Sequence, residues 1–323
     1  MGKKPLVTII TPSYNQDKYL EATIQSVLGQ DYPHIEYFIV DGGSTDGSLD
    51  IIKKYTDKIS WWVSEKDNGQ ADAINKGMRR ASGDIIAWMN SDDLYLKGAV
   101  SRAVEAIEKK PDCGFVFSNV LCIDADTNIT NTMRYGNWGV ADLASFKIIG
   151  QPGVFMNRNI LDETGLLDET YNLLLDPHLW LRIASKSDIF YVDDFWAAAR
   201  YHSEAKNTAQ GPNYPKDAIR LVNWMKESPE LREVFKSNKN RIYAGAYDFS
   251  ARYLLDSGLY GQAFIYYLRS LLKYPPTAAK DFKRILFSFF GMFLPIESLR
   301  KNYIKRRIEA LDTARFKEML VTS

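Results

Sequence analysis

Two adjacent carboxylates, Asp92 and Asp93, follow a short apolar segment and are the side chains best suited to chemistry in this chain. The apolar residues before them, 85–89, predict a fully buried strand that is too short to span a membrane. Neighbouring strand residues point to opposite faces, so both carboxylates can serve one ligand only if the chain turns there. Mg²⁺ and similar hard cations take one or two carboxylates and keep other positions for phosphate and water. A plain turn or helix cap uses the same residues, and both interpretations stay open at this point.

The elements that would position these carboxylates alternate between strand and helix. Apolar, β-branched runs predict strands at residues 6–11, 35–40 and 59–63, before the strand at 85–89. Helical patterns cover residues 17–28, 49–55, 68–81 and 97–109, with Asp17 and Asp46 expected as N-caps of the first two. We expect Pro12 to end the first strand. This alternation is typical of a mostly parallel sheet with helices on both sides.

Polar loops follow four of the predicted strands at their carboxyl ends. They are residues 12–15, 41–48, 65–70 and 90–93. In open α/β sheets, ligands bind outside the carboxyl ends of the strands, so these loops predict one shared binding site. The chain lacks both a GxGxxG segment that opens a helix and a GxxxxGK[ST] segment. Dinucleotide-binding and P-loop sites are therefore excluded.

The motifs in these loops resemble family 2 of the nucleotide-sugar glycosyltransferases. They are TPSYN at residues 11–15, VDGGSTDGS at 40–48, and GDII at 83–86 leading to NSDD at 90–93. The resemblance extends from about residue 6 to about residue 207. It implies the GT-A fold and transfer of a sugar, with inversion, from a nucleoside diphosphate donor to an acceptor hydroxyl. A UDP-sugar is the first choice of donor, because Asp41 suits the N–H edge of a uracil-like base.

The resemblance also implies roles for the side chains that contact the donor. Asp41 accepts hydrogen bonds from the base, Tyr14 stacks on it and Pro12 shapes the loop. Gln70 reaches the nucleotide or a phosphate, and Asp92 holds the ribose or the donor sugar.

The same resemblance implies a divalent cation, Mn²⁺ or Mg²⁺, held by Asp93 and completed by His202. His202 follows a predicted strand, where the family often places one late histidine. A lone histidine is more often a structural or surface residue, so that alternative stays open.

Asp176 is the expected catalytic base. Pro is favoured at the first helical position, so Asp176, before Pro177, stands where an N-cap would be. The family has an acidic residue just before a Leu-Trp-Leu-Arg helix, which matches Asp176 and implies the base. The chain departs from the family pattern in having Leu175 in place of a second acid and in carrying Pro177 and His178. We expect His178 to be a packing or rim residue.

Weaker patterns complete the first domain, which we expect to cover residues 1–210. Strands are predicted at residues 114–123, 154–156, 191–193 and 196–202, and a short helix at 157–165. Residues 208–215 are rich in Gly, Pro and Asn and are the predicted domain boundary.

The totals restrict the class of protein. The 323 residues carry a net charge of +1, from 41 basic and 40 acidic side chains, which argues against a general nucleic-acid binder. Two cysteines without a CxxC motif make a disulfide framework unexpected, and the residues before the first strand contain no signal-peptide core. We therefore expect a cytoplasmic protein.

The C-terminal part, residues 211–323, has helical patterns and no clear strand. The helices are predicted at residues 218–226, 241–256, 260–273, 278–293 and 296–311. Residues 246–272, turning at Ser257 and Gly258, resemble one tetratricopeptide-like unit, although such arrays need several repeats. The most apolar run, 285–294, is flanked by Lys and Arg. We expect it to be buried against neighbouring helices, with peripheral contact to an anionic membrane as the alternative.

Two other classes of function stay open. A sugar-phosphate nucleotidyltransferase shares much of this architecture but needs a Gly-rich, basic loop after the first strand, and residues 11–15 contain neither. A catalytically inactive, nucleotide-sugar-binding scaffold is the other class, against which the intact set Asp41, Asp92, Asp93 and Asp176 argues. By resemblance, the acceptor is a surface polysaccharide or lipid-linked glycan.

Overall fold

The computed structural model describes residues 4–202, 204–206, 210–294, 305–306, 308–311 and 313–320. The chain forms two compact units. The first contains Met1–Trp138, Ile149–Arg200 and Asp312–Ser323, and the second contains Gly139–Ile148 and Tyr201–Leu311. The predicted division after residue 210 stays a proposal. Part of the predicted boundary and most of the helix predicted at 296–311 lie outside the described residues.

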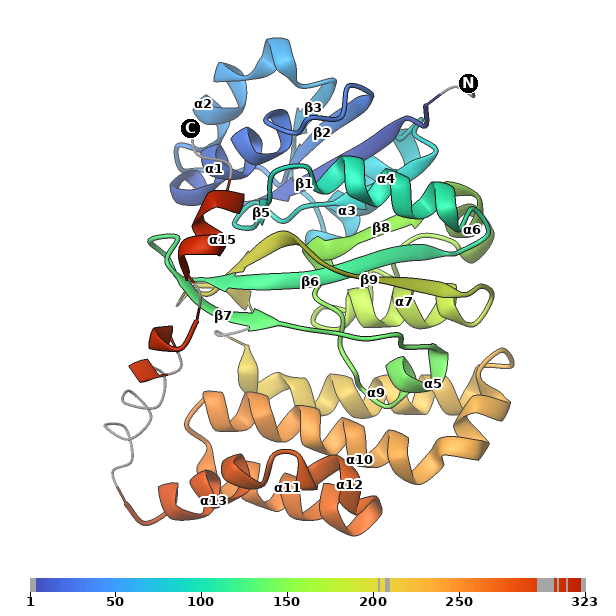
Figure 1. Ribbon diagram of the computed structural model, residues 1–323, viewed down its shortest axis with the longest axis vertical. Coiled ribbons are helices and arrows are strands. Elements are labelled where there is room, and N and C mark those ends of the chain that lie inside the picture. Colours follow the sequence, from blue (N-terminus) through green and yellow to red (C-terminus); the bar gives the residue numbers. More distant parts are fainter. Residues whose placement is uncertain are drawn as a thin grey trace. The chain divides into compact units, whose positions relative to one another are not determined.

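The first unit is built on a nine-stranded sheet (Figure 1). Its strands, in spatial order, are β3 (Trp61–Ser64), β2 (Ile35–Asp41), β1 (Val7–Ser13), β4 (Ile85–Trp88), β8 (Val154–Asn157), β6 (Phe115–Ile123), β9 (Ile189–Arg200) and β5 (Leu94–Tyr95), with β7 (Ile129–Met133) paired to β6. β3, β2, β1 and β4 are parallel, as predicted. Beyond β4 the sheet is mixed, because β8 runs antiparallel to both β4 and β6 while β6 and β9 are parallel.

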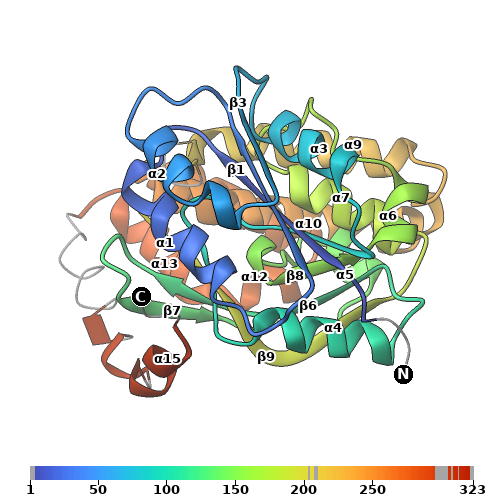
Figure 2. The same ribbon diagram turned by 90° about the horizontal axis from the view of Figure 1, so that it is seen from above.

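Helices cover both faces of the parallel strands. They are α1 (Asp17–Leu28), α2 (Ser48–Lys54), α3 (Gln70–Arg80) and α4 (Ala99–Lys109). The remaining helical segments of this unit are η1 (Thr56–Lys58), η2 (Gln151–Gly153), α6 (Arg158–Thr164), α7 (Leu175–Ala184) and α15 (Thr313–Met319). Figure 2 shows α1 and α4 on one side of β1 and α3 on the other.

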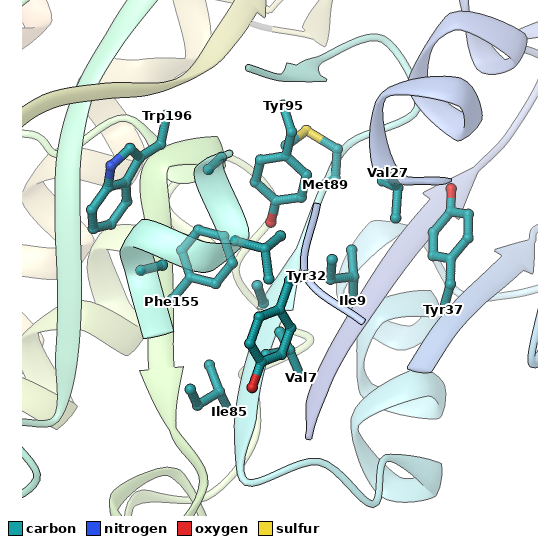
Figure 3. Packing of buried hydrophobic residues seen from close by; sticks show 14 of the residues in the cluster. Val7, Ile9, Val27, Tyr32, Tyr37, Ile85, Met89, Tyr95, Phe155 and Trp196 are labelled. Atoms are coloured by element: carbon teal, nitrogen blue, oxygen red, sulfur yellow. The ribbon is translucent and has the colours of Figure 1, made fainter. Parts of the chain in front are cut away.

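The two-residue period of β1 supplies both hydrophobic layers. Val7 and Ile9 belong to a buried cluster that includes residues of α1 and α4, where Tyr95 stacks on Phe155 at 5.4 Å (Figure 3). Ile10 faces α3, where a Cβ on Gly77 would lie 2.6 Å from its Cγ2. Glycine at 77 thus allows α3 to approach the sheet closely.

Two predicted strand boundaries were wrong, each for a local reason. Pro12 does not end β1, since it pairs with Val40 of β2. β4 pairs only with residues up to Ile10, so Pro12 lies where β1 has one neighbour and its missing N–H costs no ladder bond. The two strands predicted at 191–202 are one strand, β9, whose register skips Asp193 and Asp194 at a bulge.

The second unit is helical. Its elements are α5 (Val140–Ala144), η3 (Gly211–Asn213), α9 (Tyr214–Glu227), α10 (Arg232–Asp256), α11 (Tyr260–Lys273), α12 (Pro275–Ala279) and α13 (Phe282–Gly291). α10 and α11 form a hairpin through Gly258, whose φ of +76° favours glycine. The single helix predicted at 278–293 is wrong, because α12 ends at Ala279 and α13 starts at Phe282. Among the described residues, no helix is long and apolar enough to cross a membrane.

Two aspartates and the arginine between them tie α10 to the start of α13. Asp248 is buried and binds Arg252 at 2.6 Å, and Arg252 also binds Asp281 at 2.8 Å. Burial, opposed by Arg252 and reinforced by Asp281, raises the pKa of Asp248 to about 7. Folding therefore favours the protonated carboxyl group.

We predict that Asp248 makes the protein less stable as the pH rises toward 7. A folded-state pKa above the unfolded value gives stability that is complete below about pH 4 and is lost as the pH rises through 7. Asp248→Asn stays neutral, so its melting temperature relative to wild type should increase between pH 5 and pH 8. Thermal melts at both pH values measure this difference, with Glu227→Gln, exposed on α9, as the control. A difference that does not change with pH would contradict the prediction.

Candidate functional site

Asp41 ends β2 and holds the following loop closed. Its Oδ2 accepts hydrogen bonds from the backbone N–H groups of Gly43 and Ser44, at 3.1 and 2.9 Å, and from Ser64 Oγ on β3 at 2.6 Å. Its Oδ1 accepts one from Ser44 Oγ at 2.5 Å. A carboxylate has about four acceptor positions, so Oδ1 keeps capacity for a further N–H donor such as that of a base.

The loop after β1 is bonded directly to the loop after β2. Asn15 has a φ of +51°, a conformation that asparagine tolerates. Its N–H donates to Ser44 Oγ, and its Oδ1 accepts the N–H of Thr45, both at 2.8 Å. Tyr14, beside Asn15, is 60% exposed. The phenol ring is therefore presented to solvent from a fixed backbone, which suits stacking on a base.

Reciprocal bonds between two aspartates complete this connection. Asp46 accepts the N–H of Asp17 at 3.0 Å, and Asp17 accepts the N–H of Gly47 at 3.2 Å. The prediction that Asp17 caps α1 was wrong, because Asp17 is the first helical residue and Gln16 precedes the helix. The predicted N-cap of α2 was also wrong by one residue, because Gly47 and not Asp46 precedes Ser48, although Asp46 accepts the N–H of Ser48 at 2.9 Å. The aspartates thus set the shape of the site as well as helix ends.

The chain turns at Asp92 and Asp93, as a shared site requires. The N–H of Asp93 donates to the carbonyl of Asn90 at 3.1 Å, and the carbonyl of Asp93 accepts Thr23 Oγ1 from α1 at 2.8 Å. Asp93 is 5% exposed and Asp92 is partly exposed. The carboxylate nearer the sheet is therefore fixed, and its neighbour lies nearer to solvent.

A hydrogen-bond chain connects Asp93 to α3. Asp93 Oδ2 accepts Asn90 Nδ2 at 3.1 Å, and Asn90 Oδ1 accepts Gln70 Nε2 at 2.9 Å. Burial first, and then the neighbouring Asp92, raise the pKa of Asp93, while the N–H of Arg200 and the amide of Asn90 lower it. Gln70, the first residue of α3, is thus placed beside the acidic turn.

Arg200 is a site residue that the sequence analysis missed. Its backbone N–H donates to Asp93 Oδ1 at 2.8 Å, and its Nε donates to the carbonyl of Asp92 at 2.9 Å. The guanidinium also donates to Thr127 Oγ1 at 2.9 Å and lies 4.9 Å from the centre of the Tyr19 ring. The one available signal was a single arginine at the end of an apolar segment, 195–199. Arg200, at the end of β9, therefore holds the Asp92–Asp93 turn in place.

The acidic turn fits a cation that receives its other ligands from a substrate. Among the described residues, no cluster of three or more His, Cys, Asp or Glu side chains could hold a metal by itself. Mg²⁺-type sites need only one or two carboxylates when phosphate oxygens complete the shell. A nearby cation would also favour ionised Asp93, whose burial opposes ionisation. His202 belongs to the second compact unit, so its ligand role stays a prediction.

Asp176 lies within α7 and is not its N-cap. The helix starts at Leu175, preceded by Leu174, so the predicted cap was wrong by two residues. Asp176 still lies in the first turn, where the helix dipole favours its ionised form. Trp180, one turn further and on the same helix face, stacks on Trp88 at 5.2 Å. Because Trp88 ends β4, α7 is anchored to the strand that leads to Asp92 and Asp93.

His178 serves packing, as expected. It is buried and stacks on Tyr171 with ring centres 4.3 Å apart. Its ring therefore supports the segment before α7 instead of facing a substrate.

Gln151 is a second residue that the sequence analysis missed. Its Nε2 donates to the carbonyl of Trp88 at 2.7 Å. Its Oε1 is buried without a hydrogen-bond partner among the described residues. Tyr135 accepts the N–H of Gly150 at 2.8 Å; burial raises the pKa of Tyr135, and this bond lowers it. Gln151 is therefore bonded to the end of β4, and the glycine before it is bonded to Tyr135.

Solved structures show the same fold. A mannosyltransferase, PcManGT from Pyrobaculum calidifontis, in complex with GDP-Man and Mn²⁺, superposes with a TM-score of 0.61 at 17% identity, covering 99% of this chain and 89% of that one. S. aureus TarS 1–349 in complex with UDP-GlcNAc gives 0.57 at 13% identity, covering 86% and 92%. At this identity the likeness shows the fold alone, which is the GT-A fold predicted from the motifs, followed by helices.

Sequence relatives cover parts of the chain. A Bacillus subtilis protein with the provisional name teichuronic acid biosynthesis glycosyltransferase TuaG is 42% identical over 118 residues, which are 36% of this chain and 46% of that protein. An uncharacterized glycosyltransferase of Rickettsia typhi is 27% identical over 215 residues, 64% of this chain and 67% of its own. The chain thus spans about half of the first relative and two thirds of the second. Residues 8–170, about half of the chain, match the family model of Glycosyl transferase family 2. The motifs at the strand ends, the GT-A fold and this match agree, and the chain belongs to glycosyl transferase family 2.

Proposed function

We propose that this protein transfers a sugar from a UDP-sugar to an acceptor hydroxyl with inversion, aided by a divalent cation. The observation that carries the proposal is the pair of hydrogen-bonded loops at the carboxyl ends of β2 and β4, the two strands that flank β1. Asp41 organises a loop that can receive a base, and the Asn90–Asp93 turn presents two carboxylates where a diphosphate would lie. Family membership supports the reaction class.

The donor would lie across the carboxyl ends of β1, β2 and β4. Asp41 Oδ1 would accept the N–H of the uracil, and Tyr14 would stack on the base, with Pro12 fixing the backbone before it. Asp92 would bind the ribose or the donor sugar. Gln70, held by Asn90, would donate to a phosphate oxygen.

Asp93 would hold the cation, with His202 as a second protein ligand. When bound, Mn²⁺ or Mg²⁺ would stabilise the negative charge that develops on the departing diphosphate. The bonds from Arg200 and Asn90 fix the Asp93 carboxylate before any ligand arrives. Such fixed geometry reduces the reorganisation needed during the reaction.

Asp176 would act as the general base in a single displacement. The acceptor oxygen attacks the anomeric carbon on the face opposite the diphosphate, the bond from that carbon to the diphosphate oxygen breaks, and the acceptor proton passes to the Asp176 carboxylate. Gln151 Oε1, which has no partner in the described part of the chain, is suited to accept a hydroxyl hydrogen bond from the sugar or the acceptor.

The acceptor we propose is a surface polysaccharide or lipid-linked glycan, reached from the cytoplasm by a protein with peripheral membrane contact. The provisional name of TuaG, teichuronic acid biosynthesis glycosyltransferase, supports this class. Nucleotidyl transfer is disfavoured, because the loop after β1 lacks glycine and basic residues and is bonded to the next loop.

Nucleotide binding tests the donor assignment. With Mn²⁺ present, UDP should bind more tightly than GDP or dTDP, because Asp41 and Tyr14 suit a uracil-sized base. Calorimetry with the three nucleotides measures the order, and Asp57→Asn, an exposed change in η1, is the control. Tighter binding of GDP, the nucleotide in the PcManGT complex, would overturn the choice of UDP. Metal-dependent hydrolysis of a UDP-sugar would separate an enzyme from an inactive scaffold.

A further inference from the structure

The helical unit exposes an apolar surface that includes most of the run 285–294, which we expected to be buried. On α11 the exposed residues are Ile265, Leu268, Leu271 and Leu272, and on α13 and the turn after it they are Phe282, Leu286, Phe289, Phe290, Met292, Phe293 and Leu294. We call this set the α11–α13 surface. Leu272 is 85% exposed and Phe293 is 71% exposed. Within the run 285–294, the expectation of burial is therefore wrong for Leu286, Phe289, Phe290, Met292, Phe293 and Leu294.

Helical spacing gathers these residues on one side of each helix. Ile265, Leu268 and Leu272 are separated by three and four residues, as are Phe282, Leu286 and Phe289 on the second helix. The two helices touch where Phe264 packs against Phe289, with ring centres 5.3 Å apart. The stripes thus belong to one packed pair of helices. Soluble proteins rarely expose apolar surface on this scale without a partner.

The charges around this surface have a single sign. Residues 260–294 contain five cations, Arg269, Lys273, Lys280, Lys283 and Arg284, and one acid, Asp281. Asp281 pairs with Arg252 at 2.8 Å and with Arg284 at 3.4 Å, which leaves Arg269, Lys273, Lys280 and Lys283 without an opposing acid in this segment. A surface that combines aromatic and aliphatic side chains with such an excess of cations matches an anionic lipid surface.

We propose that the α11–α13 surface binds the face of an anionic membrane. α13 has ten residues and is thus about 15 Å long, half of a bilayer's hydrocarbon core, so it would lie in the interface and not cross it. A second copy of this chain fits less well, because a symmetric dimer would place the cations of both copies together without acids to pair them. If the proposed function holds, this contact would keep the enzyme where lipid-linked acceptors are found.

Vesicle flotation of the full chain tests the proposal. Binding should be at least about tenfold stronger to phosphatidylcholine vesicles that contain phosphatidylglycerol than to phosphatidylcholine alone, and added salt should weaken it. Leu272→Glu/Phe293→Glu changes the two most exposed residues, so the fold should persist, and it should lower binding about tenfold or more. Unchanged circular dichroism and UDP affinity would verify that the variant is folded.

A matched pair of charge variants separates local from general electrostatics. Lys280→Glu/Lys283→Glu should lose the salt-sensitive part of binding, whereas Lys226→Glu/Lys239→Glu, with the same charge change at exposed positions of α9 and α10, should bind as wild type does. Equal losses in both variants would overturn the proposal. The absence of vesicle binding by the wild-type protein would also overturn the proposal. A third contrary result would be a dimer, seen by light scattering, that Leu272→Glu/Phe293→Glu dissociates while neither protein binds vesicles.

Discussion

Asp176→Asn should lower turnover by roughly 10²- to 10⁴-fold, the usual span for losing a positioned general base, and leave donor affinity and melting temperature almost unchanged. Asn keeps the shape of the side chain but is not basic. Asp176 is in the first turn of α7 and is not its N-cap, and Asn can accept the same hydrogen bonds through its amide oxygen, so helix stability should change little. The stacking of Trp180 on Trp88 holds the helix in either variant.

Steady-state kinetics and donor calorimetry on one preparation measure both quantities. Glu163→Gln, an exposed carboxylate on the neighbouring helix α6, is the control and should keep full turnover. Near-normal turnover of Asp176→Asn would place the base elsewhere. A large fall in melting temperature would instead assign Asp176 a structural role.

The strand ends were predictable because they depend on local sequence. β-branched apolar runs gave β1, β2 and β4, and Asp41 and the Asp92–Asp93 pair stand directly after such runs. The parallel order of these strands follows from the helices between them. The motifs at their ends were sufficient for the family, which the family match confirms.

The partners of these residues were not predictable, because they come from distant parts of the chain. Arg200 is 107 residues from Asp93, and its contribution includes a backbone N–H that carries no sequence signal. Gln151 reaches Trp88 across 63 residues. The bulge in β9 also led us to predict two strands where there is one, because Asp193 and Asp194, which the register skips, resemble a turn in the sequence. Long-range pairing is decided by packing, which one sequence does not display.

Asp93→Asn should abolish metal-dependent UDP binding, with a loss of roughly 10²-fold or more in affinity. This loss should exceed the one that follows mutation of a residue that only orients a metal ligand. Asn fits the site because one amide oxygen can still accept the N–H of Arg200. Asp93→Ala would leave that N–H and the amide of Asn90 unpaired, at a cost of about 1–3 kcal/mol each. Asn is therefore the variant that separates binding from folding.

Calorimetric titration of UDP with Mn²⁺ and with excess chelator measures the effect. Asp84→Asn, at the opposite end of β4 where it accepts the N–H of Leu6, is the matched control and should retain metal-dependent binding. His202→Ala should weaken the metal response less than Asp93→Asn, and an unchanged metal titration would remove His202 from the site. Burial and the neighbouring Asp92 both disfavour the ionised form of Asp93. A bound cation would therefore stabilise this carboxylate more than it would stabilise a pair of exposed carboxylates. Wild-type UDP affinity and turnover that persist in chelator would therefore contradict the metal site itself, independently of the donor's identity.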